Sequence, residues 1–295
     1  MKQIVDKVTG VNFFPSHDYV FPDLRDSIFQ SISNKVVTAV LRADDDGLIV
    51  GIPDFQKTAD DLGLDVRFVI DDATWVSAGD RIAEFRGAPK QIAKAEERLI
   101  GMLAKPSGIA TQTRQFVEAA GDDLRIVSGA WKKMPMVLKH VIRHAIRSAG
   151  ADFRITRVNF VYLDKNFVRM LGGIRETLIA TRHIKDHEKV IQIKGQYKDV
   201  EKEAVEAAES GAHIVFIDTG HMDDIDRVSH ALIEAGLRES VILAYAGNVR
   251  LSDIATLREK DVDRIDIGRA IVDAPLLDMK IDVIDIQDEV SADDG

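Results

Sequence analysis

The sequence predicts a two-part fold, in which a small α+β domain precedes a series of βα units. In residues 35–86, short β-rich runs are separated by Asp and Gly clusters, and helical periodicity appears near residues 54–62 and 89–103. After Ser107–Gly108, runs that are apolar at almost every position alternate with helical segments. Such runs are typical of parallel strands covered on both faces. Repeated βα units form either a barrel or a doubly wound sheet, and six strands fit both.

Each expected element follows from a local pattern. The first part has three β-rich runs, at residues 36–41, 47–51 and 66–70. The second part has six apolar runs, at residues 124–128, 158–163, 189–193, 213–218, 241–245 and 264–267. Helices are expected between them, at residues 136–149, 167–182, 199–210, 223–236 and 250–259. The acidic tail after Val283 is expected to fray or to pack on the first domain.

Composition excludes several classes of protein. The chain has 295 residues, of which 45% are hydrophobic, so it can bury a large core. Because it has no cysteine, it has no disulfide, no thiolate metal site and no cysteine nucleophile. No secretory signal is visible in Met1–Leu24, and no apolar run reaches the roughly 18 residues that a membrane span requires. We therefore expect a cytoplasmic protein without a membrane partner.

One basic segment stands out from an overall net charge of -10, which itself argues against nucleic acid as the main partner. Residues 124–151 contain no Asp or Glu. Their basic residues are Arg125, Lys132, Lys133, Lys139, His140, Arg143, His144 and Arg147. The segment predicts binding of an anion, and the alternative is a solvated basic helix face.

Two of the predicted strands end in residues that could carry chemistry, because parallel folds place their working residues at strand carboxyl ends. The strand at 124–128 is followed by Lys132 and Lys133, which could meet a phosphate or a carboxylate. The strand at 213–218 closes on Asp218. This carboxylate could bind Mg²⁺, hold ribose hydroxyls or stabilise a cationic sugar, and the alternative is a helix N-cap.

The last two predicted strands run into glycine turns. Gly247 and Asn248 follow one strand, and Gly268 and Arg269 follow the other. A glycine before a helix lets backbone N–H groups approach a phosphate. Since the last two βα loops of barrels commonly form a phosphate site, the consecutive pair predicts one here.

From about Ala39 to Ile284 the chain resembles the quinolinate phosphoribosyltransferase family. Residues 95–103 and Ser107–Thr113 are similar to the family's AER…LN…LSGIAT segment. Further similar segments, in the family's order, are Ala145–Arg147, Phe153–Arg154, Gly211–Asp218 (family GADIIMLD), Ala246–Val249 (family SGGI) and Asp263–Gly268 (family VDYISVG). Their order, spacing and coverage make the resemblance specific.

The resemblance implies an N-terminal α/β sandwich followed by an open (β/α) barrel of the type II phosphoribosyltransferase kind. We expect the sandwich over residues 1–107, joined by residues 279–295, and the barrel over residues 108–278. It also implies a dimer or hexamer whose active sites are completed by the partner subunit, a phosphorylated substrate, and Mg²⁺, with Asp218 as the candidate metal ligand.

The resemblance also assigns roles. It makes Lys133 and Asp218 the candidate catalytic residues. The candidate substrate-binding residues are Lys132, Lys139, Arg147, Arg154, Asp164, Gly247, Asn248, Gly268 and Arg269.

Several positions depart from the family pattern. The family's DTRKTTPG segment is represented by residues 130–137, in which an Arg becomes Lys132 and Lys133 is kept. Asp164 stands where the family has a lysine that grips the acid, and Phe153 replaces a histidine. The remaining departures are Glu97 for an interface arginine, Gln192 or Lys194 for a strand glutamate, and Ala244 for the glutamate before SGGI.

These departures weaken the quinolinate side more than the phosphoribosyl side, because charge reversals in closed sites cost a few kcal/mol. We expect a phosphoribosyltransferase that uses 5-phosphoribosyl pyrophosphate and a pyridine-carboxylate-like or other heterocyclic acceptor, not quinolinate. Two alternatives stay open. One is a non-catalytic relative that binds a phosphorylated metabolite, and the other is a barrel enzyme that acts on another sugar phosphate.

Overall fold

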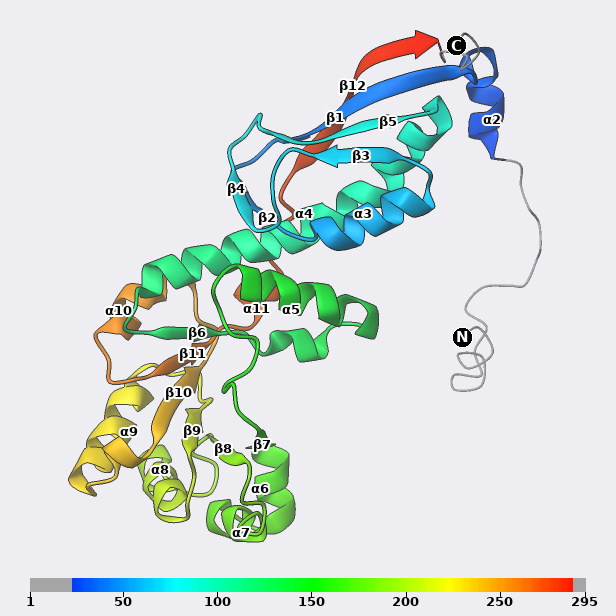
Figure 1. Cartoon of the computed structure of the whole chain (residues 1–295). Helices are drawn as coiled ribbons and strands as arrows, with labels where there is room; N and C mark the ends of the chain where they lie inside the picture. The colour runs from blue at the N-terminus through cyan, green and yellow to red at the C-terminus, as the bar shows by residue number, and fades with distance from the viewer. Residues whose placement is uncertain (1–22, 289–295) are drawn as a thin grey trace, which may run out of the picture.

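The structure is a computed structural model that describes residues 23–288. The expectations for residues 1–22 and 289–295, including the absence of a secretory signal, lie outside the described residues. Figure 1 shows a first domain built on one sheet, a second domain built on another, and the long helix α4 (Pro89–Ala120) running between them. Within the described part of the chain, no helix is both long and apolar enough to span a membrane.

The first domain contains a four-stranded sheet and a two-stranded ribbon. The sheet has the order β12 (Met279–Asp288), β1 (Lys35–Ala43), β5 (Arg81–Gly87), β3 (Asp65–Phe68), and the ribbon pairs β2 (Gly47–Ile49) with β4 (Thr74–Val76). The short helices α2 (Leu24–Ile28) and η1 (Gln30–Ile32) precede the sheet. Helix α3 (Ile52–Asp61) and the first half of α4 share one apolar core with the sheet, in which Phe55 and Phe85 are fully buried.

The last described strand belongs to the first sheet although it follows the second domain in the chain. Strand β12 pairs antiparallel with β1, from Lys35 opposite Asp288 to Ala43 opposite Met279. The tail was expected either to fray or to pack on the first domain. Its residues up to 288 pack on the first domain.

Helix α4 is longer than the sequence pattern predicts. Its expected end near residue 103 is wrong, because the helix continues to Ala120 and crosses the predicted junction at 107–108 without a break. Pro106 and Gly108 both lie inside the helix and are buried. The backbone approaches its neighbours closely here, since the ideal Cβ position of Gly108 lies 1.9 Å from the carbonyl oxygen of Pro275. The two residues therefore serve packing and do not end the helix.

The second domain is an open barrel of parallel strands. Its sheet has the order β6 (Arg125–Val127), β11 (Arg264–Asp266), β10 (Ile242–Ala246), β9 (Ile214–Ile217), β8 (Glu188–Ile193), β7 (Phe160–Leu163). The first strand, β6, lies beside the last, β11, so the sheet curls into a barrel that is open between β6 and β7. This order excludes the doubly wound alternative and confirms the barrel.

Helices cover the outside of the barrel (Figure 1). In chain order they are α5 (Lys139–Ser148), α6 (Lys165–Leu171), α7 (Ile174–Ala180), α8 (Val200–Glu209), α9 (Asp223–Glu234), α10 (Ile254–Arg258) and α11 (Arg269–Val272). Short 3₁₀ turns are η2 (Ala130–Lys133), η3 (Met136–Leu138), η4 (Arg238–Ser240) and η5 (Leu251–Asp253). The single helix expected at 167–182 is two helices, because Gly172 and Gly173 adopt positive φ values of 92° and 152° between them.

Alternate residues of the barrel strands form a small interior core that includes Val127, Val190, Ile214, Phe216 and Ala244. The other set faces the helices and joins the large outer core.

The segment after α5 crosses the barrel opening. Val127 forms an isolated parallel bridge with Asp152, and the indole N–H of Trp131 donates to the carbonyl of Phe153 over 2.7 Å. The guanidinium of Arg264 donates to the carbonyl of Ile155. The opening is therefore closed by irregular chain that the neighbouring side chains hold in place.

The close approach at Gly108 generates a stability prediction. Gly108→Ala places a methyl group against the backbone of Pro275, so we expect a loss of about 3 kcal/mol in the free energy of unfolding, at the upper end for overpacking. The matched control is Gly101→Ala in the same helix, where nothing lies within 4 Å of the new Cβ. It should gain about 1 kcal/mol from helix propensity. Urea unfolding measures both changes, and equal stability of the two variants would contradict the packing role.

Candidate active site

A cavity of about 990 Å³ lies at the carboxyl ends of the barrel strands. Its lining includes residues from all six strands of the barrel sheet or the loops that follow them. Among them are Gly129, Ala130, Lys132, Lys133, Tyr162, Gln192, Phe216, Asp218, Ala246, Gly247, Asn248, Asp266, Gly268 and Arg269. The lysine pair, Asp218 and both glycine turns, which lie far apart in the sequence, thus open onto one space.

The lysine pair lies in η2, directly after β6, and both side chains are exposed. The ammonium of Lys132 lies 4.8 Å from the ring centroid of Tyr162, on the far side of the barrel opening. Burial raises the pKa of the Tyr162 hydroxyl, and the negative charges of Asp266 and Asp218 raise it further. Tyr162 therefore stays a neutral hydroxyl, and its ring lies beside the ammonium of Lys132.

Asp266 is a site residue that the sequence argument missed. It is the last residue of β11, and its Oδ1 accepts a hydrogen bond from the backbone N–H of Gly129 over 2.8 Å. This bond joins the start of the lysine turn to the neighbouring strand β11. Burial raises the pKa of Asp266, while the Gly129 hydrogen bond and the charge of Lys132 oppose the rise. The sequence contained a signal for Asp266, because Asp266 is also a carboxylate at the end of an apolar strand, which was the argument for Asp218.

Asp218 lies at the end of β9 and already has partners. The ammonium of Lys194 donates to its Oδ2 over 3.0 Å and to its backbone carbonyl, and the amide of Gln192 donates to the same Oδ2. Among residues 23–288, no group of three or more His, Asp or Glu side chains could hold a metal ion. The carboxylate of Asp218 is paired with Lys194 and that of Asp266 with the backbone of Gly129, and the two do not make up such a group, so no chemical step is assigned to a Mg²⁺ ion held by the protein.

The glycine turns follow β10 and β11. A Cβ at Gly247 would lie 2.5 Å from the hydroxyl of Tyr245 and 2.7 Å from the Cα of Gly220, so only glycine fits. Asn248 continues the turn with a positive φ of 59°. Gly268 precedes the single turn of α11, where Arg269 is exposed and its Nε lies 3.2 Å from a carboxylate oxygen of Asp273. Both turns belong to the lining of the cavity.

Four predicted binding residues lie outside the lining of this cavity. The cations of Lys139, Arg147 and Arg154 instead lie over aromatic rings, at 6.0 Å from Trp131, 4.8 Å from Phe153 and 4.9 Å from Phe160. Asp164 caps α6 by accepting hydrogen bonds from the backbone N–H groups of Asn166 and Phe167. The structure therefore gives each of these four side chains a local partner of its own.

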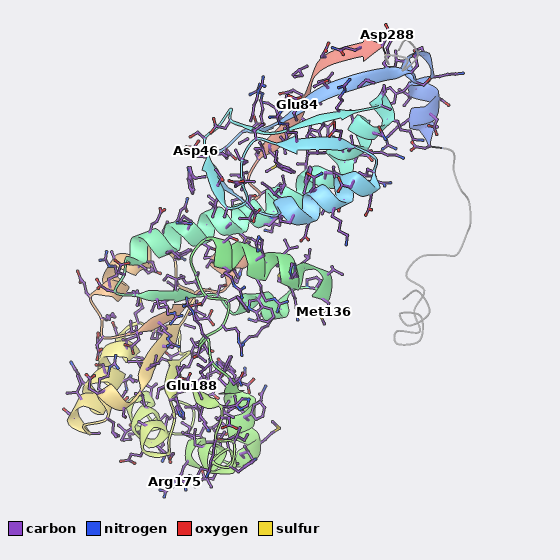
Figure 2. The ribbon with its side chains drawn as sticks, viewed as in Figure 1. Asp46, Glu84, Met136, Arg175, Glu188 and Asp288 are labelled. Atoms are coloured by element: carbon purple, nitrogen blue, oxygen red, sulfur yellow. The ribbon has the colours of Figure 1, made fainter. Side chains whose placement is uncertain are left out.

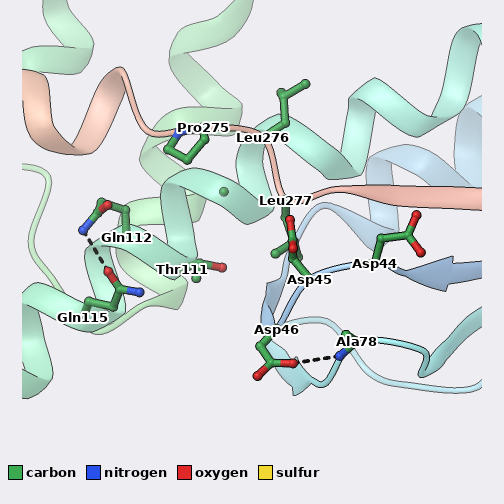
Figure 3. A pocket seen from close by; sticks show the side chains of 11 residues that line it. Asp44, Asp45, Asp46, Ala78, Thr111, Gln112, Gln115, Pro275, Leu276 and Leu277 are labelled. Atoms are coloured by element: carbon green, nitrogen blue, oxygen red, sulfur yellow. Dashed lines mark hydrogen bonds between the residues drawn. The ribbon is translucent and has the colours of Figure 1, made fainter.

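A second, smaller cavity of about 480 Å³ lies at the domain junction (Figure 3). Asp44, Asp45 and Asp46 line one side of it, and Gln112 and Gln115 line the other. Figure 3 shows Asp46 bonded to the backbone N–H of Ala78 and Gln112 bonded to Gln115. None of the predicted site residues lines this cavity.

Two family models together match most of this chain. The model of the quinolinate phosphoribosyl transferase N-terminal domain matches residues 26–107, and that of the C-terminal domain matches residues 109–282. The chain belongs to the quinolinate phosphoribosyl transferase family. The resemblance inferred from the sequence is thereby confirmed, and curated relatives are named nicotinate-nucleotide pyrophosphorylases.

Curated relatives are similar over most of their length. A probable nicotinate-nucleotide pyrophosphorylase (carboxylating) of Methanothermobacter thermautotrophicus is 25% identical over 273 residues, which cover 90% of this chain and 95% of the relative. The human nicotinate-nucleotide pyrophosphorylase (carboxylating) is 26% identical over 246 residues, which cover 82% of this chain and 81% of the relative.

Solved structures share the fold. NadC from Streptococcus pyogenes superposes with a TM-score of 0.75 at 19% identity and covers 90% of this chain and 92% of its own. The nicotinate-nucleotide pyrophosphorylase from Francisella tularensis gives a TM-score of 0.75 at 21% identity, over 88% and 90% of the two chains. At these identities the likeness confirms the predicted sandwich-and-barrel architecture.

The raised pKa of Asp266 generates a pH prediction. The unfolded chain releases this proton near the usual 3.8 of an aspartate, whereas the folded chain holds it to higher pH. As pH rises through that window the folded state binds more protons than the unfolded state, so stability falls. Asp266→Asn removes this dependence and can still accept from Gly129.

We therefore expect the stability advantage of Asp266→Asn over the parent chain to grow as pH rises above the unfolded-state value. Urea unfolding of both chains at about pH 4 and about pH 7 measures it. An advantage of the same size at both pH values would show that Asp266 does not titrate in this way.

Proposed function

We propose that this chain transfers the 5-phosphoribosyl group of 5-phosphoribosyl pyrophosphate to a heterocyclic acceptor such as a pyridine carboxylate other than quinolinate. One observation carries the proposal. Two glycine turns, a lysine pair and the carboxylate of Asp218 all line a single cavity at the barrel mouth. Family membership supports the class of reaction, and the names of the relatives support nicotinate-nucleotide chemistry.

The cavity suits a sugar that carries anions at both ends. The glycine turns at 247 and 268 offer backbone N–H groups to one phosphate, and Lys132 and Lys133 offer cations to another. Such positioning supplies much of the catalysis in transfer reactions of this kind. A nitrogen lone pair of the acceptor would form the new bond to C1′. The bond from C1′ to the pyrophosphate oxygen would break, and pyrophosphate would leave with that electron pair.

The acceptor side of the cavity is aromatic and amide-lined. Tyr162 and Phe216 meet edge to face with ring centroids 5.8 Å apart, and Gln192 lies next to them in the lining. The carboxylates of Asp218 and Asp266 also face the cavity. This lining supports a ring with fewer negative charges than a dicarboxylate, because each added carboxylate would meet these anions.

A binding protein without turnover is the second candidate, since the ion pair of Asp218 with Lys194 occupies the carboxylate that the reaction would need. Release of pyrophosphate from 5-phosphoribosyl pyrophosphate with a panel of heterocyclic acceptors decides between them. Turnover with a neutral or monocarboxylate ring supports the transferase, and binding of the donor without turnover supports the second candidate. Turnover of quinolinate at ordinary enzymatic rates would overturn the altered acceptor.

We also propose a cytoplasmic protein that self-associates as a dimer or hexamer. Met136 is 80% exposed and Val137 82%, on the turn between the lysine pair and α5. Figure 2 shows Met136 on the surface of the second domain. Exposed apolar residues beside a site are typical of an interface. Sedimentation of the purified chain measures the oligomeric state.

Removing one lysine tests the donor site. Lys133→Ala should weaken binding of 5-phosphoribosyl pyrophosphate at least about tenfold, or ~1.4 kcal/mol, because it removes one cation from the anion-binding wall. Calorimetry measures the affinity. Lys185→Ala serves as the control, because Lys185 is exposed after α7 and does not line the cavity. Unchanged binding and full activity of Lys133→Ala would refute the site.

A further inference from the structure

The loop after β8 is built around a buried carboxylate. Glu203, on the first turns of α8, is only 1% exposed. Its two oxygens accept hydrogen bonds from the backbone N–H groups of Lys194 (3.0 Å), Gly195 (2.8 Å), Tyr197 (2.9 Å) and Lys198 (3.4 Å). A charge-assisted bond to a carboxylate is stronger than a neutral one, so four of them fix the path of this loop.

The fixed path of the loop directs the side chain of Lys194 toward Asp218. The Lys194 side chain leaves the loop where Glu203 holds its backbone, and its ammonium contacts both the carboxylate and the carbonyl of Asp218. Lys194 and Gln192 line a small separate cavity of about 10 Å³, whereas the main cavity is lined by Gln192 and Asp218 but not by Lys194. The Lys194 ammonium therefore contacts Asp218 without lining the main cavity, which stays open to a ligand.

We propose that Lys194 is a tethered cation that takes the place of a protein-bound divalent ion at Asp218, and that Glu203 is the positioning residue that holds it there. The pair of Asp218 and Lys194 is formally neutral, whereas a carboxylate at position 194 would create two adjacent negative charges. A polyanionic donor could approach such a pair only after a divalent ion had neutralised it. This inference rests on the proposed function, because it names how the same site receives its donor.

The proposal predicts that the chain binds its phosphoribosyl donor with little or no help from a metal ion. The wild-type chain should bind 5-phosphoribosyl pyrophosphate in EDTA with an affinity within about threefold of that in Mg²⁺, which is less than ~1 kcal/mol. Lys194→Met leaves Asp218 uncompensated and should bind about tenfold more weakly in EDTA, with Mg²⁺ restoring most of the loss. Lys194→Glu should bind measurably only in Mg²⁺.

Two further variants separate charge from structure. Lys194→Met combined with Asp218→Asn is again neutral, so it should recover binding in EDTA if charge is the cause. Lys198→Met is the matched control, because Lys198 lies on the same loop but pairs with Glu206 at 2.9 Å. It should bind the donor in EDTA as the wild type does.

Glu203 is tested through the same readout. Glu203→Gln keeps one acceptor oxygen and loses the other, so the loop should loosen and donor binding in EDTA should weaken, with partial recovery in Mg²⁺. Glu206→Gln, one helical turn along α8 and partly exposed, should bind as the wild type does. If Glu203→Gln fails to fold, the Lys194 variants still decide the proposal, because the Lys194 side chain is one-quarter exposed.

The outcomes are distinguishable. Wild-type binding only in Mg²⁺, with Lys194→Met unchanged from it, overturns the tethered cation and leaves the phosphoribosyl site standing. Absence of binding under both conditions overturns the proposed function and this inference with it. Metal-independent binding that Lys194→Met reduces and the neutral double variant restores supports the proposal.

Discussion

A single helix that belongs to two hydrophobic cores is the constraint on which the arrangement of this protein depends. Helix α4 has 32 residues and is therefore about 48 Å long. Its first half packs Leu99 and Leu103 into the sandwich, and its second half packs Ile109 and Phe116 into the outer core of the barrel. Because one helix supplies both cores, neither domain can turn relative to the other without breaking packed contacts.

The site depends on a different principle, the meeting of charges from many loops at one edge of a parallel sheet. The two carboxylates at strand ends are each held by groups from a neighbouring strand or its loop: Asp266 by the backbone of Gly129, and Asp218 by Lys194 and Gln192. These bonds orient the loops before any ligand arrives. The exposed cations in the cavity lining are those of the lysine pair, Arg250 and Arg269, so the mouth can attract an anion without further rearrangement of its walls.

Much of the fold could be predicted from the sequence, because parallel strands that are buried on both faces leave long apolar runs. The six runs of the second part each correspond to a barrel strand. The end of α4 could not be predicted, since Pro106 and Gly108 usually end a helix and only the packing against Pro275 explains their presence within it. The glycine pair at 172–173 marked a break that the helical periodicity concealed.

The site was predicted in part for related reasons. Residues at strand ends, such as Lys133 and Asp218, could be located by counting along apolar runs, and they do line one cavity. Lys194 could not be recognised in this way, because its direction depends on Glu203, nine residues further along the chain. Likewise Arg147 and Arg154 look like anion ligands in sequence, and only the structure reveals the rings of Phe153 and Phe160 beneath them.

The return of β12 to the first sheet has a consequence for synthesis on the ribosome. The pairing of Lys35 with Asp288 closes the sandwich across nearly the whole chain. Since domains emerge and fold in order from the N-terminus, the strand β1 leaves the ribosome long before its neighbour exists. Until translation is almost complete, one edge of the nascent sheet stays unpaired, and such an edge can recruit a strand from another chain. Assembly of this protein is thus most vulnerable to aggregation during the period in which its barrel is being made.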